Sequence, residues 1–105
     1  MEQPNLSYIN DLAGDDAAFK AKLCSTIKDE LPREIDEYKK SIQNNNYTEA
    51  ANHVHKLKHK ISVMGMEKSY YLAEEFERNL KNQSVTLQSE FENILLKMQQ
   101  FADGL

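Results

Sequence analysis

The sequence predicts an all-α protein, an antiparallel (up-down) four-helix bundle that follows a short N-terminal helical turn. Helix breakers are few, because the 105 residues include only 3 glycines and 2 prolines. Lys, Glu, Leu and Ala, which favour helices, are frequent. Apolar residues recur every three or four positions, the spacing of one helix face, and several such stripes follow one another along the chain. Because short polar stretches separate the stripes, we expect a single domain over residues 1–105 with one core.

A helical turn is expected over residues 6–12, and a long helix over residues 15–41. Asp15 or Asp16 can cap the long helix by accepting a hydrogen bond from its first turn. Pro32 lies inside the stripe and removes one backbone donor, so it can kink the helix there without ending it. The predicted stripe of this helix comprises Phe19, Leu23, Ile27, Leu31, Ile35, Tyr38 and Ile42.

The next two helices are expected over residues 46–64 and 67–81. Asn45 or Asn46 can cap the first of them, and Gly65 favours the left-handed turn that ends a helix. The stripe of the first comprises Tyr47, Ala50, Val54, Leu57, Ile61 and Met64. The stripe of the second comprises Leu72, Phe76 and Leu80.

The last helix is expected over residues 85–102, with Ser84 as its N-terminal cap. Its stripe comprises Leu87, Phe91, Ile94, Leu95, Met98 and Phe101. Each stripe covers one face of its helix, so the helices must pack these faces together to keep them from water. One monomeric bundle is enough to do so.

The charge balance argues against two classes of partner. There are 17 acidic and 13 basic residues, a net charge of -4, whereas nucleic acids and anionic membrane surfaces bind basic proteins. No apolar run is long enough for membrane insertion. The lone cysteine, Cys24, cannot form an internal disulfide, which fits a reducing compartment. We therefore expect a cytoplasmic protein.

All three histidines lie on the expected helix over residues 46–64, and helical geometry separates them. At about 100° per residue, the apolar stripe of this helix is centred near Val54. His55 then lies about 120° from the centre on the solvent side, whereas His53 lies about 80° away and should be partly buried. His59 should be exposed, but it has no lysine one turn along the helix, as His55 has.

The surroundings of His55 have a chemical meaning. Imidazole is a capable nucleophile and is largely neutral near pH 7. If His55 accepted a phosphoryl group, Lys58, which we expect to be exposed, could reach the added negative charge from one helical turn away. Lys56 and Lys60 add positive charge to this acidic protein, which suits an acidic partner or a phosphate. The strip beside His55 comprises Ala51, Lys58, His59 and Ser62.

The run His55-Lys56-Leu57-Lys58, followed by Gly65, resembles the motif of histidine-containing phosphotransfer (HPt) domains, which reads His-x-Leu-Lys-Gly with a further glycine downstream. The resemblance extends over the whole chain, because a long first helix with a proline interruption and a short polar loop precede the histidine helix. It implies a phosphorelay intermediate: His55 accepts a phosphoryl group from the aspartate of one receiver domain and passes it to another, and Lys58 stabilises the phosphate. The residues that we expect to bind the partner are Ala51, Lys56, His59 and Ser62.

The same resemblance implies a phosphocarrier without kinase activity of its own. The catalytic machinery and the divalent metal belong to the receiver, so we expect neither a cofactor nor a bound metal in this domain. The domain either stands alone or forms the cytoplasmic C-terminal module of a membrane-bound hybrid sensor kinase, and the sequence does not distinguish the two.

One position departs from the family pattern. His59 occupies the place of the glycine that usually follows the motif lysine and leaves room for the receiver. It could obstruct docking, hydrogen-bond the phosphate or turn into solvent. Two alternatives stay open as well: a non-catalytic helical interaction module, and a metal site in which His55 and His59, one helical turn apart, bind one ion. The metal site has no obvious third ligand.

Overall fold

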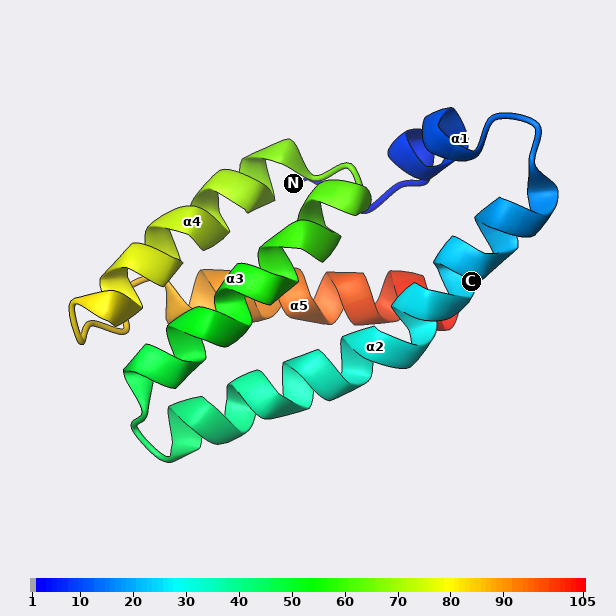
Figure 1. Ribbon diagram of the computed structural model, residues 1–105. Coiled ribbons are helices and arrows are strands. Elements are labelled where there is room, and N and C mark those ends of the chain that lie inside the picture. Colours follow the sequence, from blue (N-terminus) through cyan, green and yellow to red (C-terminus); the bar gives the residue numbers. More distant parts are fainter. Residues whose placement is uncertain (1) are drawn as a thin grey trace.

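The computed structural model describes residues 2–105, which form five helices. They are α1 (Ser7–Ala13), α2 (Ala17–Gln43), α3 (Tyr47–Val63), α4 (Glu67–Lys81) and α5 (Gln88–Asp103). The long helices α2 to α5 alternate in direction and pack into a bundle, whereas the short α1 lies at one end of it and contacts α2 (Figure 1). The all-α class and the helical bundle with its short N-terminal helix are confirmed.

α2 is one continuous helix of 27 residues despite Pro32. Asp16 caps it by accepting a hydrogen bond from the Phe19 N–H at 2.9 Å. The first turns of α2 extend past the other long helices (Figure 1). Lys28, three turns into α2, lies beside the last residue of the chain, with its Nζ 3.5 Å from the Leu105 carbonyl oxygen. Phe19 therefore has no helix of the bundle to cover it. It is exposed, and its place in the predicted buried stripe is wrong.

Gly65 ends α3 as predicted, in the left-handed conformation with a φ of 74°. The Gly65 N–H bonds to the Ser62 carbonyl at 3.0 Å and the Met66 N–H bonds to the Ile61 carbonyl at 3.2 Å. This pair of bonds satisfies the last carbonyls of the helix. A side chain at Gly65 would also collide with Asn5, so the N-terminal segment packs directly on this turn.

Asn45 and Asn46 have different roles at the junction of α2 and α3. Asn45 takes a left-handed conformation, with a φ of 55°, and follows the end of α2 as Gly65 follows α3. Asn46 caps α3, because its Oδ1 accepts a hydrogen bond from the Glu49 N–H at 3.2 Å. Of the two predicted candidates, Asn46 is therefore the cap.

The start of α5 differs from the prediction. α5 begins at Gln88 rather than at position 85, and no side chain caps it. Ser84 is not the cap, because α5 begins four residues after it; its N–H bonds to the Asn79 carbonyl at 2.8 Å, in the turn that follows α4. The Ser84 Oγ instead accepts a hydrogen bond from the Thr86 N–H at 3.2 Å, within the loop.

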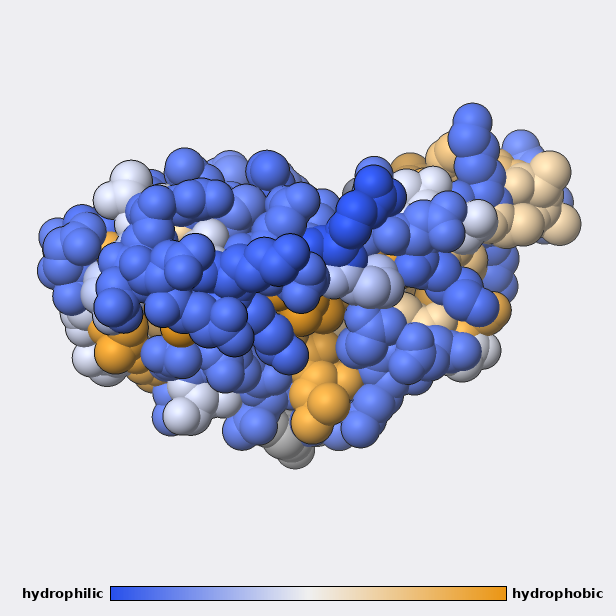
Figure 2. Space-filling view, turned by 90° about the horizontal axis from the view of Figure 1, so that it is seen from below, coloured by the Kyte–Doolittle hydropathy of each residue, from blue (hydrophilic) through white to orange (hydrophobic). Residues whose placement is uncertain are grey.

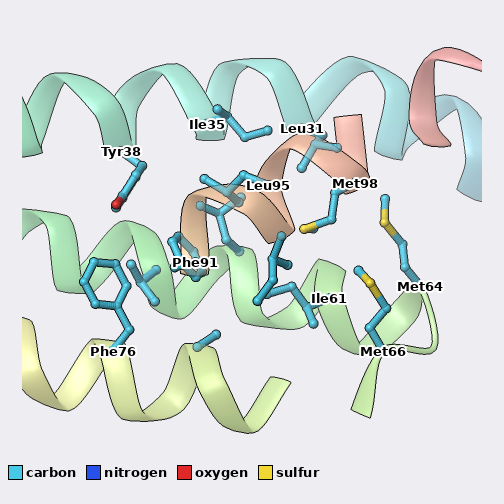
Figure 3. Close-up of a cluster of buried hydrophobic side chains, with 14 of the residues drawn as sticks. Leu31, Ile35, Tyr38, Ile61, Met64, Met66, Phe76, Phe91, Leu95 and Met98 are labelled. Atoms are coloured by element: carbon cyan, nitrogen blue, oxygen red, sulfur yellow. The ribbon is translucent and has the colours of Figure 1, made fainter. Parts of the chain in front are cut away.

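The core holds aromatic rings toward one end and methionines toward the other (Figure 3). Phe91 of α5 contacts Tyr38 of α2 and Phe76 of α4, with ring centroids 5.3 and 5.1 Å apart. The Tyr38 hydroxyl donates to Glu92 Oε2 at 3.0 Å, and burial together with this carboxylate raises the pKa of Tyr38. The buried methionines are Met64, Met66 and Met98. These contacts join helices that are distant in the sequence, so they fix α4 and α5 relative to α2.

α3 packs against both α2 and α4, and this placement leaves only one strip of it in solvent. The predicted stripe is buried from Ala50 to Met64, whereas Tyr47 at its start is half-buried. The exposed strip on the outward side includes His55, Lys56, His59 and Ser62.

Hydrophilic side chains cover most of the face shown in Figure 2, and apolar ones gather there in small patches. Large apolar side chains that remain exposed include Tyr8, Leu12, Tyr71 and Leu96. No helix within residues 2–105 combines the length and the apolar character needed to cross a membrane.

Candidate functional site

His55 lies on the exposed strip of α3, but one edge of its ring is held by the protein. Its Nδ1 lies 3.3 Å from Oε1 of Glu77, which α4 supplies. Its Nε2 makes no hydrogen bond with a protein group of residues 2–105. The side chain as a whole is exposed, as predicted. One ring nitrogen is thus oriented, and the other is free to react.

Glu77 is a buried carboxylate shared by three partners. Besides the His55 ring, Oε1 pairs with Lys58 Nζ at 3.0 Å, and Oε2 pairs with Lys81 Nζ at 3.1 Å. Burial by itself raises the pKa of Glu77, but the hydrogen bonds from Lys58, Lys81 and His55 outweigh it and hold that pKa below its ordinary value. Glu77 is therefore ionised at neutral pH.

The ionised Glu77 decides which nitrogen of a neutral His55 carries the hydrogen. An ionised carboxylate can only accept hydrogen bonds, so Nδ1 must be the donor. The lone pair of the neutral ring then lies on Nε2, at the edge that Glu77 does not contact. A nucleophilic imidazole reacts through this lone pair.

Lys58 is buried, and the prediction that it is exposed is wrong. Its side chain is 9% exposed, and its Nζ lies between the Glu77 carboxylate and the face of the Tyr70 ring, 5.5 Å from the ring centroid. The prediction assumed one buried face on α3, whereas α4 covers a second flank of that helix. Lys58 nevertheless remains beside His55, because both contact the same oxygen of Glu77.

Ala51 lies on the same flank and is 1% exposed. Its predicted place in the partner-binding surface is therefore wrong, because its side chain does not reach the surface. The other three residues predicted for that surface, Lys56, His59 and Ser62, are exposed.

His53 is buried, in agreement with the prediction of partial burial, and it faces α2 rather than α4. Its Nε2 lies 3.4 Å from Glu49 Oε1, and its Nδ1 lies 3.7 Å from Glu37 Oε2. His53 and Glu49 belong to α3 and Glu37 to α2, so the contact with Glu37 links the two helices.

Lys60 also faces α2. Its Nζ lies 3.0 Å from Glu30 Oε1 and 2.9 Å from Glu34 Oε1, and its side chain is half-buried. These carboxylates offset its charge. Of the two lysines expected to add positive charge around the site, Lys56 is therefore the one that presents it to solvent.

His59 stands beside His55 with its ring nearly perpendicular. The ring centroids are 5.3 Å apart and the interplanar angle is 88°. No group of three or more His, Cys, Asp or Glu side chains within residues 2–105 is arranged to hold a metal ion. The two rings thus lack, in this part of the chain, the third ligand that a zinc site requires.

Glu77 is the site residue that the sequence reasoning missed. The sequence does indicate that Glu77 is buried, because it lies four residues after Ala73 and three before Leu80, the spacing of a core-facing position. An acidic residue at such a position needs a cationic partner, and Lys81 lies one helical turn further along. The pattern marks Glu77 as buried, but it does not name His55 and Lys58 as its partners.

The family comparison covers this whole site. A family model, the Hpt domain, matches residues 22–104, which include most of α2 and all of α3, α4 and α5. Comparisons with curated proteins and with solved structures gave no match. Because the family model matches most of its length, the chain belongs to the Hpt domain family, the phosphocarriers in which a histidine transfers phosphoryl groups within phosphorelays.

Proposed function

We propose that this domain carries a phosphoryl group from the aspartate of one receiver domain to that of another, and that His55 is the residue that holds it. The observation that carries this proposal is an exposed His55 ring whose Nδ1 contacts the ionised carboxylate of Glu77. His53 is buried between glutamates, and His59 has no carboxylate within ion-pair distance among residues 2–105. Only His55 combines an accessible nitrogen with an oriented ring.

Transfer begins when Nε2 of neutral His55 attacks the phosphorus of a receiver's aspartyl phosphate. The Nε2–P bond forms while the bond from phosphorus to the aspartyl oxygen breaks, and its electron pair returns to the donor carboxylate. His55 keeps its hydrogen on Nδ1 and becomes positively charged, so no proton has to leave. In the second transfer, a carboxylate oxygen of the next receiver attacks phosphorus, and the electrons of the Nε2–P bond restore the neutral ring.

Glu77 stabilises the positive charge that develops on the ring. Its Oε1 lies 3.3 Å from Nδ1, and its burial weakens the screening by water. The attraction strengthens as the ring becomes charged, so it lowers the barrier to transfer more than it stabilises the resting protein. The same contact keeps Nε2 pointed away from α4.

Lys58 has two roles in this proposal. It holds the Glu77 carboxylate in place through the ion pair at 3.0 Å. An ammonium group has three donors, so two remain for the oxygens of a phosphoryl group on His55. Because the side chain is buried, this charge is positioned before the phosphoryl group arrives.

The partner must cover the exposed strip of α3, since its aspartyl phosphate has to come within bonding distance of Nε2. Lys56, His59 and Ser62 are the exposed residues that we assign to this interface. In this scheme the domain supplies the phosphate carrier, and the receiver supplies the catalytic machinery of the transfer.

The test uses purified receiver domains labelled with radioactive acetyl phosphate and magnesium, then mixed with the full chain. The wild type should acquire an acid-labile, base-stable label. His55→Gln should acquire none, whereas His53→Gln and His59→Gln, which make the same change nearby, should still be labelled.

Label retained by His55→Gln would show that another residue carries the phosphate. If receivers bind the wild type in a titration calorimeter and yet never label it, the domain is a non-catalytic interaction module instead. Stoichiometric zinc binding that is lost in His59→Ala would support the metal-site alternative.

A further inference from the structure

His59 is the histidine that the proposed function leaves without a chemical role. Its ring is exposed and stands perpendicular to that of His55, with the centroids 5.3 Å apart. His53 and His55 each contact glutamates, whereas within residues 2–105 no carboxylate lies within ion-pair distance of His59. The N–H groups of His59 therefore have no charged acceptor in the described part of the chain.

The charges on either side of α3 favour an anion beside this ring. The carboxylates that α4 and α2 present there are already paired with lysines: Glu77 with Lys58 and Lys81, and Glu30 and Glu34 with Lys60. On α3 itself, Lys56 adds an exposed positive charge to the same strip. A negatively charged group on His55 would thus give His59 an acceptor on the neighbouring ring.

A phosphoryl group on His55 provides this acceptor. Bonded to Nε2, it adds acceptor oxygens at the ring edge that points away from Glu77. The two ring centroids are 5.3 Å apart, so the exposed His59 ring is a neighbouring donor for these oxygens.

We propose that His59 is a positioning residue that donates a hydrogen bond to the phosphoryl group on His55 and prolongs the lifetime of the phosphohistidine. This inference rests on the proposed function. Hydrolysis of the phosphoryl group passes through a loose, metaphosphate-like transition state. A donor bound to the charged oxygens of the resting intermediate stabilises that intermediate more than the transition state, so it slows hydrolysis.

Because the proposed donor is a histidine, its contact with the phosphoryl group can be tested by changing the pH. Imidazole is the side chain that ordinarily changes its charge between about pH 5 and about pH 8. A charged donor forms a stronger hydrogen bond to an anion than a neutral donor does. The advantage that His59 gives over an uncharged donor should therefore grow as the pH falls, whatever the acid lability of the phosphohistidine itself.

The experiment compares the decay of labelled protein after the receiver has been removed. Wild type, His59→Gln and His59→Gly are labelled through a receiver and incubated at about pH 8 and about pH 6. At the higher pH, His59→Gln should decay at nearly the wild-type rate, because its amide also donates, and His59→Gly should decay faster than both. At the lower pH, the wild type should outlast His59→Gln by about threefold or more.

Thr48→Ala is the matched control, an exposed substitution on the same helix two turns before His55, and should decay as the wild type does at both pH values. Circular dichroism spectra establish that all variants are folded. A ratio of wild-type to His59→Gln lifetimes that stays the same at both pH values would overturn the inference and leave the phosphate on His55. Failure to label His55 in the wild type would overturn the proposed function, and this inference with it.

Discussion

His53 and His55 lie two residues apart on α3, and burial is distributed in opposite ways around them. The His53 side chain is 10% exposed, while those of its neighbours Glu37 and Glu49 are 50% and 56% exposed. The His55 side chain is 56% exposed, while that of Glu77 is 8% exposed. At His53 the ring is buried and the neighbouring carboxylates are exposed to water, whereas at His55 the carboxylate is buried and the ring is exposed.

This difference supports the proposal that His55, and not His53, is the reactive histidine. Exposed carboxylates are screened by water and hold a buried ring only weakly. Two lysines keep the buried carboxylate of Glu77 ionised. Its negative charge attracts any group beside it that becomes positively charged. Because α2 covers one side of α3 and α4 the other, the neighbouring helix decides how each histidine is held.

Glu77→Gln should break this contrast and produce the largest effect. Gln keeps the size of the side chain but removes its charge, and the buried ammonium of Lys58 loses its carboxylate. We expect the free energy of unfolding to fall by about 3 kcal/mol, the low end for one partner of a buried ion pair. Transfer to His55 should slow by about tenfold or more, because the charged ring loses its counter-charge. Urea unfolding and the rate of labelling by a receiver measure the two effects.

Glu37→Gln is the matched control, because it makes the same change at a half-exposed glutamate beside His53. Its free energy of unfolding should stay within about 0.5 kcal/mol of the wild type, and its transfer rate should be unchanged. Equal behaviour of Glu77→Gln and Glu37→Gln would mean that the buried carboxylate does not distinguish the two histidines.

Features that depend on nearby residues could be predicted from the sequence. The stripe of α3, the Asp16 cap and the turn at Gly65 involve bonds or spacings within a few residues of one another. Pro32 was correctly placed inside a continuous α2. The exposure of His55 also followed from its angle to the stripe of its own helix.

Features that depend on a second helix could not be predicted in this way. Lys58 and Ala51 are buried because α4 covers their flank, and the periodicity of α3 alone does not show which neighbour lies there. The pairing of Glu77 with His55 is a contact between two helices for the same reason. Likewise, Ser84 belongs to the turn that follows α4, and α5 begins only at Gln88.

Lys58→Met tests the cationic half of the same site and should have a smaller effect than Glu77→Gln. Methionine keeps the aliphatic contacts, and Glu77 retains Lys81 as a partner, so no buried charge is left alone. We expect a loss of about 2 kcal/mol in the free energy of unfolding, within the range for a hydrogen bond to a charged group. Transfer should also slow, because the carboxylate is less firmly held and the phosphoryl group loses a donor.

Lys60→Met is the control for this change, because Lys60 pairs with two glutamates of α2 on the opposite side of α3. It should lose a similar amount of stability and transfer phosphate at the wild-type rate. If both lysine variants slowed transfer equally, the effect would reflect the stability of α3 rather than the site on the α4 side.

Glu2→Gln should have the smallest effect, and it separates two ways of lowering a carboxyl pKa. Glu2 accepts hydrogen bonds from the backbone N–H groups of Lys68 at 2.9 Å and Ser69 at 2.8 Å, in the first turn of α4. Burial by itself raises the pKa of Glu2, but these backbone donors outweigh it and hold that pKa below its ordinary value of 4.5. Glu77 owes its lowered pKa to side-chain cations instead.

Because the pKa of Glu2 is lowered in the folded protein, its contribution to stability is complete above the ordinary value of 4.5 and is lost as the pH falls through the lower, folded value. Glu2→Gln should therefore cost about 0.5 kcal/mol near neutral pH, the value of an anion at a helix N-terminus. The difference from the wild type should vanish in acid, and the transfer rate should not change. Urea midpoints measured across this pH range test the sign, since a difference that persisted in acid would come from the shape of the side chain and not from its charge.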